Sequence, residues 1–466
     1  MDRSQRLGTE SVPALLLQFS VPAIVGMMAQ ALYNVIDRAF VGHALGPPGI
    51  AGITVCFPFM LMLLAFAMLI GFGAAALVSI YLGEGKRGAA EDVLGNAAVL
   101  LLIVSASLTG LGLAMLDPLL HTFGASSTIL PYARDYLYII VLGTVFQVGG
   151  FGLNAVIRGE GNPRTAMLTL LIGVVLNLIL APVFIFGLGW GMRGAGLATV
   201  ISQAVSAVWV VAYFARGRSL LRLRWWNLGL QIPTARKILV IGSPPFAMQM
   251  AATVMNSLLN HQLRLHGGDI AISIMGVVYV VAMMVAMPIF GVNQGAQPII
   301  GYNYGAGKYD RVRKALLTAI LAATAIAAFG FLVAMLLPGQ VMRLFNRSDE
   351  ALVQLGSRAM RVSLMMMPLI GFQIVSASYF QAVGKPKQAM FLMLSRQLLL
   401  LIPAVLILPL FFRLNGVWAA LPAADFGSSV MTGSCLLLEM RHLHRRQAET
   451  AEASGTVSAA LPAQAG

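Results

Sequence analysis

Apolar runs of about 20 residues recur along almost the whole chain, and they constrain its fold more than any other feature. As a helix, a run of that length crosses the ~30 Å hydrocarbon core of a bilayer. The composition agrees, since 58% of the 466 residues are hydrophobic and only 10% are charged, whereas soluble chains carry about 25% charged residues. None of the runs alternates polar and apolar residues as the strands of a membrane β-barrel do. The sequence therefore predicts an all-α polytopic membrane protein.

The lengths of the runs and the polar turns between them predict twelve transmembrane helices. The spans are expected near residues 13–38, 50–81, 93–115, 132–156, 165–188, 194–214, 236–262, 270–303, 315–337, 354–381, 388–411 and 416–438. The tail that follows, residues 441–466, is mostly small and polar and is expected to be disordered in the cytoplasm.

Basic residues gather in alternate loops between these spans. One set of loops, together with both termini, carries 21 of the 31 Lys and Arg residues. Arg396 lies inside a span, and the opposite loops and adjoining span ends carry the remaining nine: Arg38, Arg134, Arg193, Arg264, Arg343, Arg347, Arg358, Arg361 and Arg413. The positive-inside rule therefore predicts that both termini are cytoplasmic. The net charge of +14 reflects this topology, so no nucleic-acid partner is predicted.

The sequence repeats itself at an offset of about 222 residues, in order and along most of its length. The aligned pairs include Pro22 with Pro244, Asn34 with Asn256, Gly46 with Gly268, GEGK at 83–86 with GAGK at 305–308, and GNPRTAM at 161–167 with GKPKQAM at 384–390. Duplication of six spans gives parallel repeats related by an axis along the membrane normal. We expect an N-lobe over residues 1–215, an inter-lobe loop over 216–237 and a C-lobe over 238–440.

A polar stripe crosses the first span and contains an acid. Gln30, Tyr33, Asn34 and Asp37 follow the three- and four-residue spacing that shares one helix face. An ionisable residue within a span usually faces the bundle interior and marks an ion or proton path. The alternative is that Asp37 pairs with Arg38 as an anchor at the membrane interface.

Few other residues could carry chemistry. Asp425 is the other acid within a span, without an obvious polar stripe, and Glu160 lies beside a loop, where it is expected to be solvated. The sequence has no elbow serine, no paired carboxylates and no metal-ligand spacing of His or Cys. It therefore predicts neither an enzyme nor a metal protein, and no cofactor.

Several segments resemble the MATE family of multidrug and toxic compound exporters: YNVIDRAFVG at 33–42, RGEGNPRTAM at 158–167, LNLILAPVFIFGLGWG at 176–191 and GAGLATVIS at 194–202. The likeness covers essentially all twelve spans. It implies two six-helix lobes around a central cavity, with antiport of protons or sodium expelling mostly cationic, amphipathic compounds. It also implies an N-lobe coupling site built on Asp37 of the polar stripe. The residues expected at this site are Asp37, Tyr33, Asn34, Asn154, Asn177 and Thr199, with Pro22 at a helix bend.

The sequence departs from the family pattern at two places. Ala181 precedes Pro182 where the family often has Asp, and the acids that the sodium-coupled branch carries in spans 7 and 10 are absent. The C-lobe cavity candidates are instead Gln249, Asn256 and Gln373. Coupling is therefore expected to rest on Asp37, with protons favoured over sodium.

These features predict a secondary active multidrug exporter of the bacterial cytoplasmic (inner) membrane, working by alternating access. Its partners would be organic cations and membrane lipid, and the protein is expected to be a monomer. The alternative is a lipid-linked oligosaccharide flippase of the same superfamily, which would line its cavity with Arg or Lys. Arg396 is the one basic residue placed firmly inside the membrane.

Overall fold

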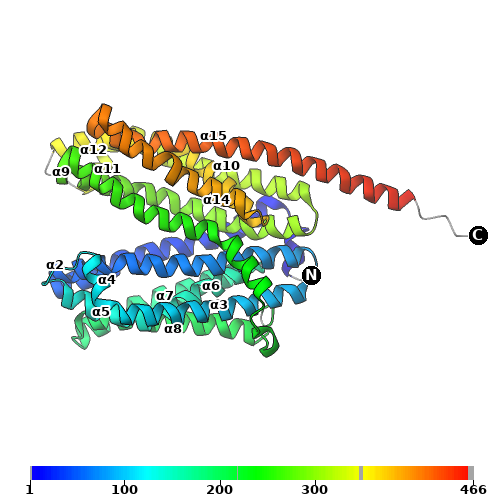
Figure 1. Ribbon diagram of the computed structural model, residues 1–466, viewed down its shortest axis with the longest axis horizontal. Helices are drawn as coiled ribbons and strands as arrows, with labels where there is room; N and C mark the ends of the chain where they lie inside the picture. The colour runs from blue at the N-terminus through cyan, green and yellow to red at the C-terminus, as the bar shows by residue number, and fades with distance from the viewer. Residues whose placement is uncertain (1–2, 218, 346–349, 460–466) are drawn as a thin grey trace, which may run out of the picture.

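The computed structural model describes residues 3–217, 219–345 and 350–459, and all its regular elements in these ranges are helical (Figure 1). The elements are α1 (Arg3–Leu7), α2 (Val12–Gly83), α3 (Arg87–Ala114), α4 (Leu116–Thr122), α5 (Leu130–Leu142), α6 (Thr144–Gly159), α7 (Pro163–Pro182), η1 (Val183–Gly187), α8 (Gly191–Ala215), η2 (Trp225–Leu228), α9 (Ile232–Gly305), α10 (Tyr309–Leu336), α11 (Pro338–Phe345), α12 (Glu350–Ser363), α13 (Met367–Ala382), α14 (Pro386–Leu394), η3 (Ser395–Leu401) and α15 (Ile402–Ala459).

The predicted twelve spans match the long helices, and the short elements α1, α4, η2 and α11 lie outside them. Within the described residues, eight stretches are long and apolar enough to cross a membrane, or ten when the bent pairs α5–α6 and α12–α13 each count as one span. Two of the eight stretches, 72 and 60 residues long, are broken at Gly46 and Arg413 and so make two spans each. The fold is therefore an all-α membrane protein of twelve spans, as the run lengths predict.

The sequence duplication is repeated in the backbone. Gly46 (φ 66°, ψ −162°) breaks α2 between spans 1 and 2, and Gly268 (φ 63°, ψ −161°) breaks α9 between spans 7 and 8. Only glycine adopts this region without strain, because a Cβ clashes there. The GEGK and GAGK turns match in the same way, with φ of 74° at Gly85 and 69° at Gly307.

The helices form two layers, α2–α8 below and α9–α15 above in the view of Figure 1. Each layer is one lobe with its own apolar core. The N-terminal helix, the GEGK turn and the GAGK turn lie at the right-hand end of the bundle, which we call the basic end. The breaks at Gly46 and Gly268 lie at the opposite end.

Each lobe begins inside the core of the other. Val12, Leu15 and Phe19 at the start of α2 are buried against Ile289 and Val292 of the C-lobe. The start of α9 does the reverse, since its segment 235–241 packs into the N-lobe core. This exchange joins the lobes at the basic end, where both helices start.

Glycines let the two lobes approach closely at the basic end. A Cβ on Gly83 would lie 2.0 Å from the carbonyl oxygen of Tyr302, and one on Gly305 would lie 2.1 Å from that of Ile80. These two contacts are equivalent under the duplication, so the pseudo-twofold axis passes between them. The structure therefore shows a state in which the lobes are closed against each other at the basic end.

Helix α15 continues past the last span as far as Ala459. It thus runs through most of the segment 441–466 for which we predicted a disordered tail. Residues 441–452 (RHLHRRQAETAE) are rich in Arg, Ala, Gln and Glu, which are good helix formers even without a packing partner.

Candidate functional site

The polar stripe of the first span carries a buried carboxyl group. Asp37 is only 5% exposed, and Tyr33, one turn earlier on α2, is 8% exposed. Asn177 of α7 and Thr199 of α8 are buried beside them. Three of the predicted N-lobe partners therefore meet Asp37 between spans 1, 5 and 6.

A hydrogen-bonded chain links these side chains. The Thr199 hydroxyl lies 3.5 Å from the Tyr33 hydroxyl and accepts a bond of 3.2 Å from the Asn177 amide nitrogen. Thr199 itself donates to the carbonyl oxygen of Ala195, 3.1 Å away. Tyr136 of α5, which is 1% exposed, shares a side-chain hydrogen bond with Thr199. It also interacts electrostatically with Asp37. Tyr136 was missed from the sequence, because it follows Arg134 and Asp135 at the start of a span and no sequence pattern links it to span 1.

Two acceptors in this cluster have no partner. Asp37 Oδ1 and Asn177 Oδ1 are both buried, and neither receives a hydrogen bond from the described residues. A buried oxygen without a donor costs about 1–3 kcal/mol, and more when it is charged. These two oxygens could therefore accept a proton or coordinate a small cation.

Arg38 does not form an ion pair with Asp37. The Arg38 guanidinium lies over the ring of Phe57, with its central carbon 5.4 Å from the ring centre. Arg38 is exposed, and no ion pair joins it to Asp37 within the described part of the chain. The geometry thus argues against the alternative that Asp37 is an anchor paired with Arg38.

Three other predicted residues lie differently. Asn34 is exposed, although it shares the stripe with the buried Tyr33. Asn154 is buried, but its partners are not in the Asp37 cluster. With the amide oriented to satisfy both of its ends, its oxygen accepts from the Arg158 guanidinium at 3.2 Å and its nitrogen donates to the backbone oxygen of Ala166. Pro22 is buried within α2, whose one non-helical residue among those described is Gly46. Helical spacing alone could not separate the buried members of the stripe, Tyr33 and Asp37, from the exposed Asn34.

In the C-lobe, the intramembrane acid Asp425 forms an ion pair with Arg396. Asp425 of α15 is 3% exposed and accepts a 2.6 Å bond from Arg396 Nε, whose side chain is 29% exposed. Gln373 of α13 donates to the backbone oxygen of Asp425 and to the Ser429 hydroxyl. Arg396 stands in the π-helical segment η3, a distortion often found at functional positions. The sequence did not reveal this pair, since its members lie on different helices.

The remaining C-lobe candidates do not join this cluster. Gln249 is half-buried and Asn256 is exposed, and neither bonds to the Arg396–Asp425 pair. Within the described residues no group of three or more His, Cys, Asp or Glu side chains could hold a metal ion.

Glu160 is not the solvated acid that we expected. It is 1% exposed at the end of α6, and its carboxylate accepts hydrogen bonds from Tyr213 and Ser219. The start of the inter-lobe segment is thereby attached to spans 4 and 6. The expectation was wrong because the residues that bury Glu160 are more than 50 positions away in sequence.

Two homologous six-helix lobes with a buried polar site between the spans of one of them are the architecture of a membrane transporter. The MatE family model matches residues 22–183 and 244–407, which is once in each lobe and at the offset of the duplication. The chain belongs to the MatE family, and it is a multi-pass transporter of the MATE type.

Several known proteins are similar over nearly the whole chain. The multidrug export protein MepA of Staphylococcus haemolyticus (strain JCSC1435) is 27% identical over 417 residues, which cover 89% of this chain and 91% of that protein. The MATE multidrug transporter DinF-BH, solved in complex with R6G, is 41% identical with a TM-score of 0.88, covering 95% of this chain and 99% of that one. An outward-facing MATE family transporter of the MOP superfamily shares the fold at 24% identity, with a TM-score of 0.88 over 94% and 98% of the two chains.

Proposed function

We propose that this protein is a secondary active multidrug exporter that couples substrate efflux to exchange of a cation at Asp37. The substrates would be mainly cationic, amphipathic compounds, and the coupling ion a proton. The proposal draws on the multidrug function named for MepA and DinF-BH and on the geometry of the N-lobe cluster.

One observation carries the mechanism, namely the unpartnered and buried carboxyl oxygen of Asp37. An ionised carboxylate at this position lacks the donors and the counter-ion that burial demands. A proton or a bound cation would make the site neutral, and an organic cation could replace it. Exchange of one positive charge for another at Asp37 is therefore the reaction that the cluster suits.

A proton fits the cluster better than a sodium ion does. The site has one carboxylate. The Tyr33 and Thr199 hydroxyls already bond to each other, and the Asn177 amide oxygen is the other unpartnered acceptor. A proton needs only one acceptor, whereas a hard cation takes about six oxygen ligands. Sodium coupling is the second candidate, because Asp37, Asn177, Thr199 and Tyr33 all offer oxygens.

The C-lobe pair favours export of cations over the flippase alternative. A flippase would use intramembrane bases to bind a pyrophosphate, but Arg396 already has Asp425 as its counter-ion. Among the described residues of the spans, Asp425 has Arg396 as its ion-pair partner, whereas Asp37 has none.

The orientation follows from the charges. The basic end carries most Lys and Arg residues and would face the cytoplasm of a bacterial cell, with both termini there. Since the lobes meet at that end, the state described would be closed to the cytoplasm, and substrate would leave at the opposite end.

Transport by the purified protein in vesicles tests the proposal. Ethidium efflux would be followed under a pH gradient and, separately, under a sodium gradient. The wild-type protein is expected to transport under the pH gradient alone, and Asp37→Asn is expected to lower that rate at least tenfold. Asp310→Asn, which removes an exposed acid at the basic end, is the matched control and should transport like the wild type.

Each other outcome has a distinct meaning. Efflux that depends on sodium alone would assign the coupling ion to sodium. Equal rates for Asp37→Asn and the wild type would remove Asp37 from the mechanism.

A further inference from the structure

Arginines gather at the end of the molecule where the topology calls for few basic residues. Four of the nine basic residues predicted at that end lie between positions 343 and 361 of the chain. All nine are Arg, and the six lysines of the chain lie elsewhere. Arg binds phosphate groups through two parallel hydrogen bonds, which Lys cannot do. This cluster therefore opposes the positive-inside tendency.

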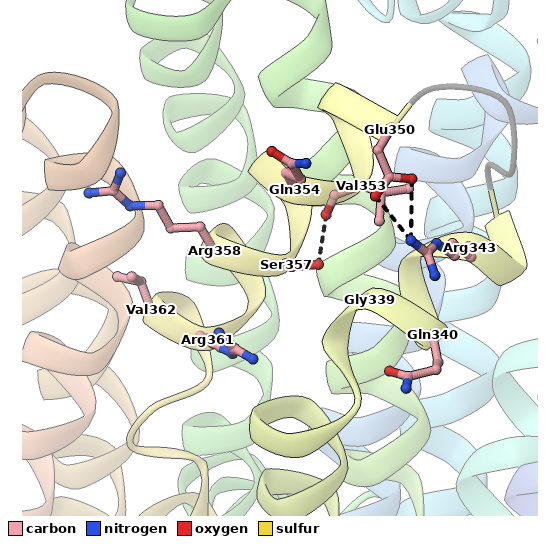
Figure 2. A pocket seen from close by; sticks show the side chains of 10 residues that line it. All are labelled: Gly339, Gln340, Arg343, Glu350, Val353, Gln354, Ser357, Arg358, Arg361 and Val362. Atoms are coloured by element: carbon pink, nitrogen blue, oxygen red, sulfur yellow. Dashed lines mark hydrogen bonds and ion pairs between the residues drawn. The ribbon is translucent and has the colours of Figure 1, made fainter.

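The described arginines of this cluster line a groove of about 640 Å³ between α11 and α12 (Figure 2). Both helices pack on the Gly268 hairpin through Met342, Val353 and Met360, so the groove lies opposite the basic end. Its polar lining consists of Gln340, Arg343, Glu350, Gln354, Ser357, Arg358 and Arg361. A volume in the range of about 300–1,000 Å³ is typical of small-ligand sites.

The groove carries positive charge that the described residues do not balance. Arg343 is paired, since its guanidinium donates to both oxygens of Glu350 at 3.0 and 3.3 Å. Arg361 donates through Nε to the backbone oxygen of Met335 at 3.2 Å. No carboxylate of the described chain pairs with Arg358 or Arg361, unlike Arg134 and Arg193 at the same end, which pair with Asp117 and Asp135. Figure 2 shows Arg361 directed toward Gln340 across the groove, whereas the side chain of Arg358 points to the other side of α12, away from α11.

Exposed apolar side chains flank the charged groove. Leu336 (70% exposed) ends α10, and Leu344 (75%) and Phe345 (51%) end α11, next in sequence to the groove residue Arg343. A ligand that fits both features has an anionic head and apolar chains. Free phosphate would satisfy the arginines but would leave this apolar surface uncovered.

We propose that the groove between α11 and α12 is a binding site for the phosphodiester headgroup of an anionic phospholipid in the leaflet opposite the basic end. Arg361 donates to the phosphate, and Arg358 adds positive charge at the rim of the groove. Gln340, Gln354 and Ser357 line the space for the rest of the headgroup. The acyl chains cover Leu344 and Phe345. This site is separate from the Asp37 cluster and does not depend on the transport mechanism.

Lipid titration of the delipidated protein in detergent tests the site. Phosphatidylglycerol and phosphatidylcholine would be added separately, with retention measured by native mass spectrometry and the melting temperature by intrinsic fluorescence. The wild type is expected to bind phosphatidylglycerol preferentially. The variant Arg358→Gln/Arg361→Gln is expected to bind it at least about tenfold more weakly, because the lost charged hydrogen bond of Arg361 contributes a factor of about ten or more.

Three controls make the result decisive. Arg264→Gln removes an exposed arginine at the same end and should keep the preference. Arg358→Lys/Arg361→Lys keeps the charge and should bind with intermediate affinity. Inorganic phosphate at the same concentration should not raise the melting temperature as phosphatidylglycerol does.

Several results would overturn the proposal. These are equal retention of the two lipids by the wild type, an unchanged preference in the double Gln variant, or an equal loss in Arg264→Gln. Stabilisation by inorganic phosphate equal to that by phosphatidylglycerol would assign the groove to a free anion instead.

Discussion

Gly242→Ala should push apart the two lobes where span 7 crosses span 2. Gly242 lies in the first span of α9, and a Cβ there would stand 1.6 Å from the carbonyl oxygen of Leu69 and 2.6 Å from its carbonyl carbon. Contacts below 3.0 Å are essentially never made by real Cβ atoms, and a backbone atom cannot rotate away as a side chain does. The two helices must therefore separate by roughly 1.4 Å to admit one methyl group.

The expected effect is a shift of population and not a loss of the fold. Overpacking by a methylene costs about 1–3 kcal/mol, and here that cost falls only on the state in which the lobes meet. Each 1.4 kcal/mol changes an equilibrium tenfold, so the closed state should lose about tenfold to a hundredfold in relative population. A protein that alternates between two states can relieve the clash by adopting the other one.

Spin labels on the two matching turns would measure the shift. The labels would replace Lys86 and Asp310, which are both exposed at the basic end, with Cys435→Ser removing the more accessible native thiol. Pulsed dipolar spectroscopy should show a single short distance for the wild type and a longer distance in Gly242→Ala. The melting temperature should stay within a few degrees of the wild type, since the alternative state is folded.

The matched control is Gly276→Ala on the same helix, where a Cβ would meet no atom within 4 Å. It should keep the short distance, and it should be slightly more stable because alanine favours the helix by about 1 kcal/mol. If Gly242→Ala and Gly276→Ala give the same distances, the close contact at Leu69 is not where the lobes part. A large fall in melting temperature without a longer distance would show that the contact is part of a rigid core.

Three further changes have defined outcomes in thermal unfolding of the detergent-solubilised protein. Arg396→Leu should destabilise by about 3–5 kcal/mol because it leaves a buried carboxylate unpaired, and adding Asp425→Leu should recover most of that loss; two additive losses would refute the pairing. Arg413→Gly should stabilise by about 1 kcal/mol because Arg413 has a φ of 49°, whereas Gly46→Ala should destabilise by about 1–3 kcal/mol at a φ of 66°; the same sign for both would contradict the strain argument. Glu160→Gln should cost about 1–3 kcal/mol, because one of the two hydroxyls that donate to Glu160 loses its acceptor; an unchanged melting temperature would mean that this network adds nothing to stability.

The sequence predicted the spans well because the bilayer fixes their length. Runs near 20 residues set the twelve helices, and the breaks fall at Gly46 and Gly268, where the predicted turns are. The repeat was visible for a similar reason, since glycines with positive φ recur at Gly85 and Gly307 and cannot be replaced cheaply.

The candidate site could be predicted only in part. Helical spacing places Tyr33 and Asp37 on one face of span 1, but it does not say which other helix that face meets. Tyr136 was missed for this reason. Asn34 was included but is exposed, since a stripe several residues wide has edges as well as a centre.

Partners on distant helices were the hardest to foresee. Asn154 is bonded to Arg158, one turn along its own helix, and not to Asp37. Arg396 and Asp425 are 29 residues apart and meet only when spans 11 and 12 pack together. Such pairings depend on the relative rotation of two helices, which composition and spacing leave free.

The duplication has left two lobes with matching backbone breaks and unequal electrostatics. The N-lobe cluster between spans 1, 4, 5 and 6 contains a carboxyl group without a counter-ion, while the equivalent spans 10, 11 and 12 of the C-lobe contain a carboxylate with its own guanidinium. A tethered counter-ion cannot leave, so the C-lobe pair stays neutral without exchanging anything with solvent or substrate. An exchangeable charge is possible only where the counter-ion is free to come and go. Under the proposed mechanism, this asymmetry limits coupling to one positive charge per cycle, carried at Asp37.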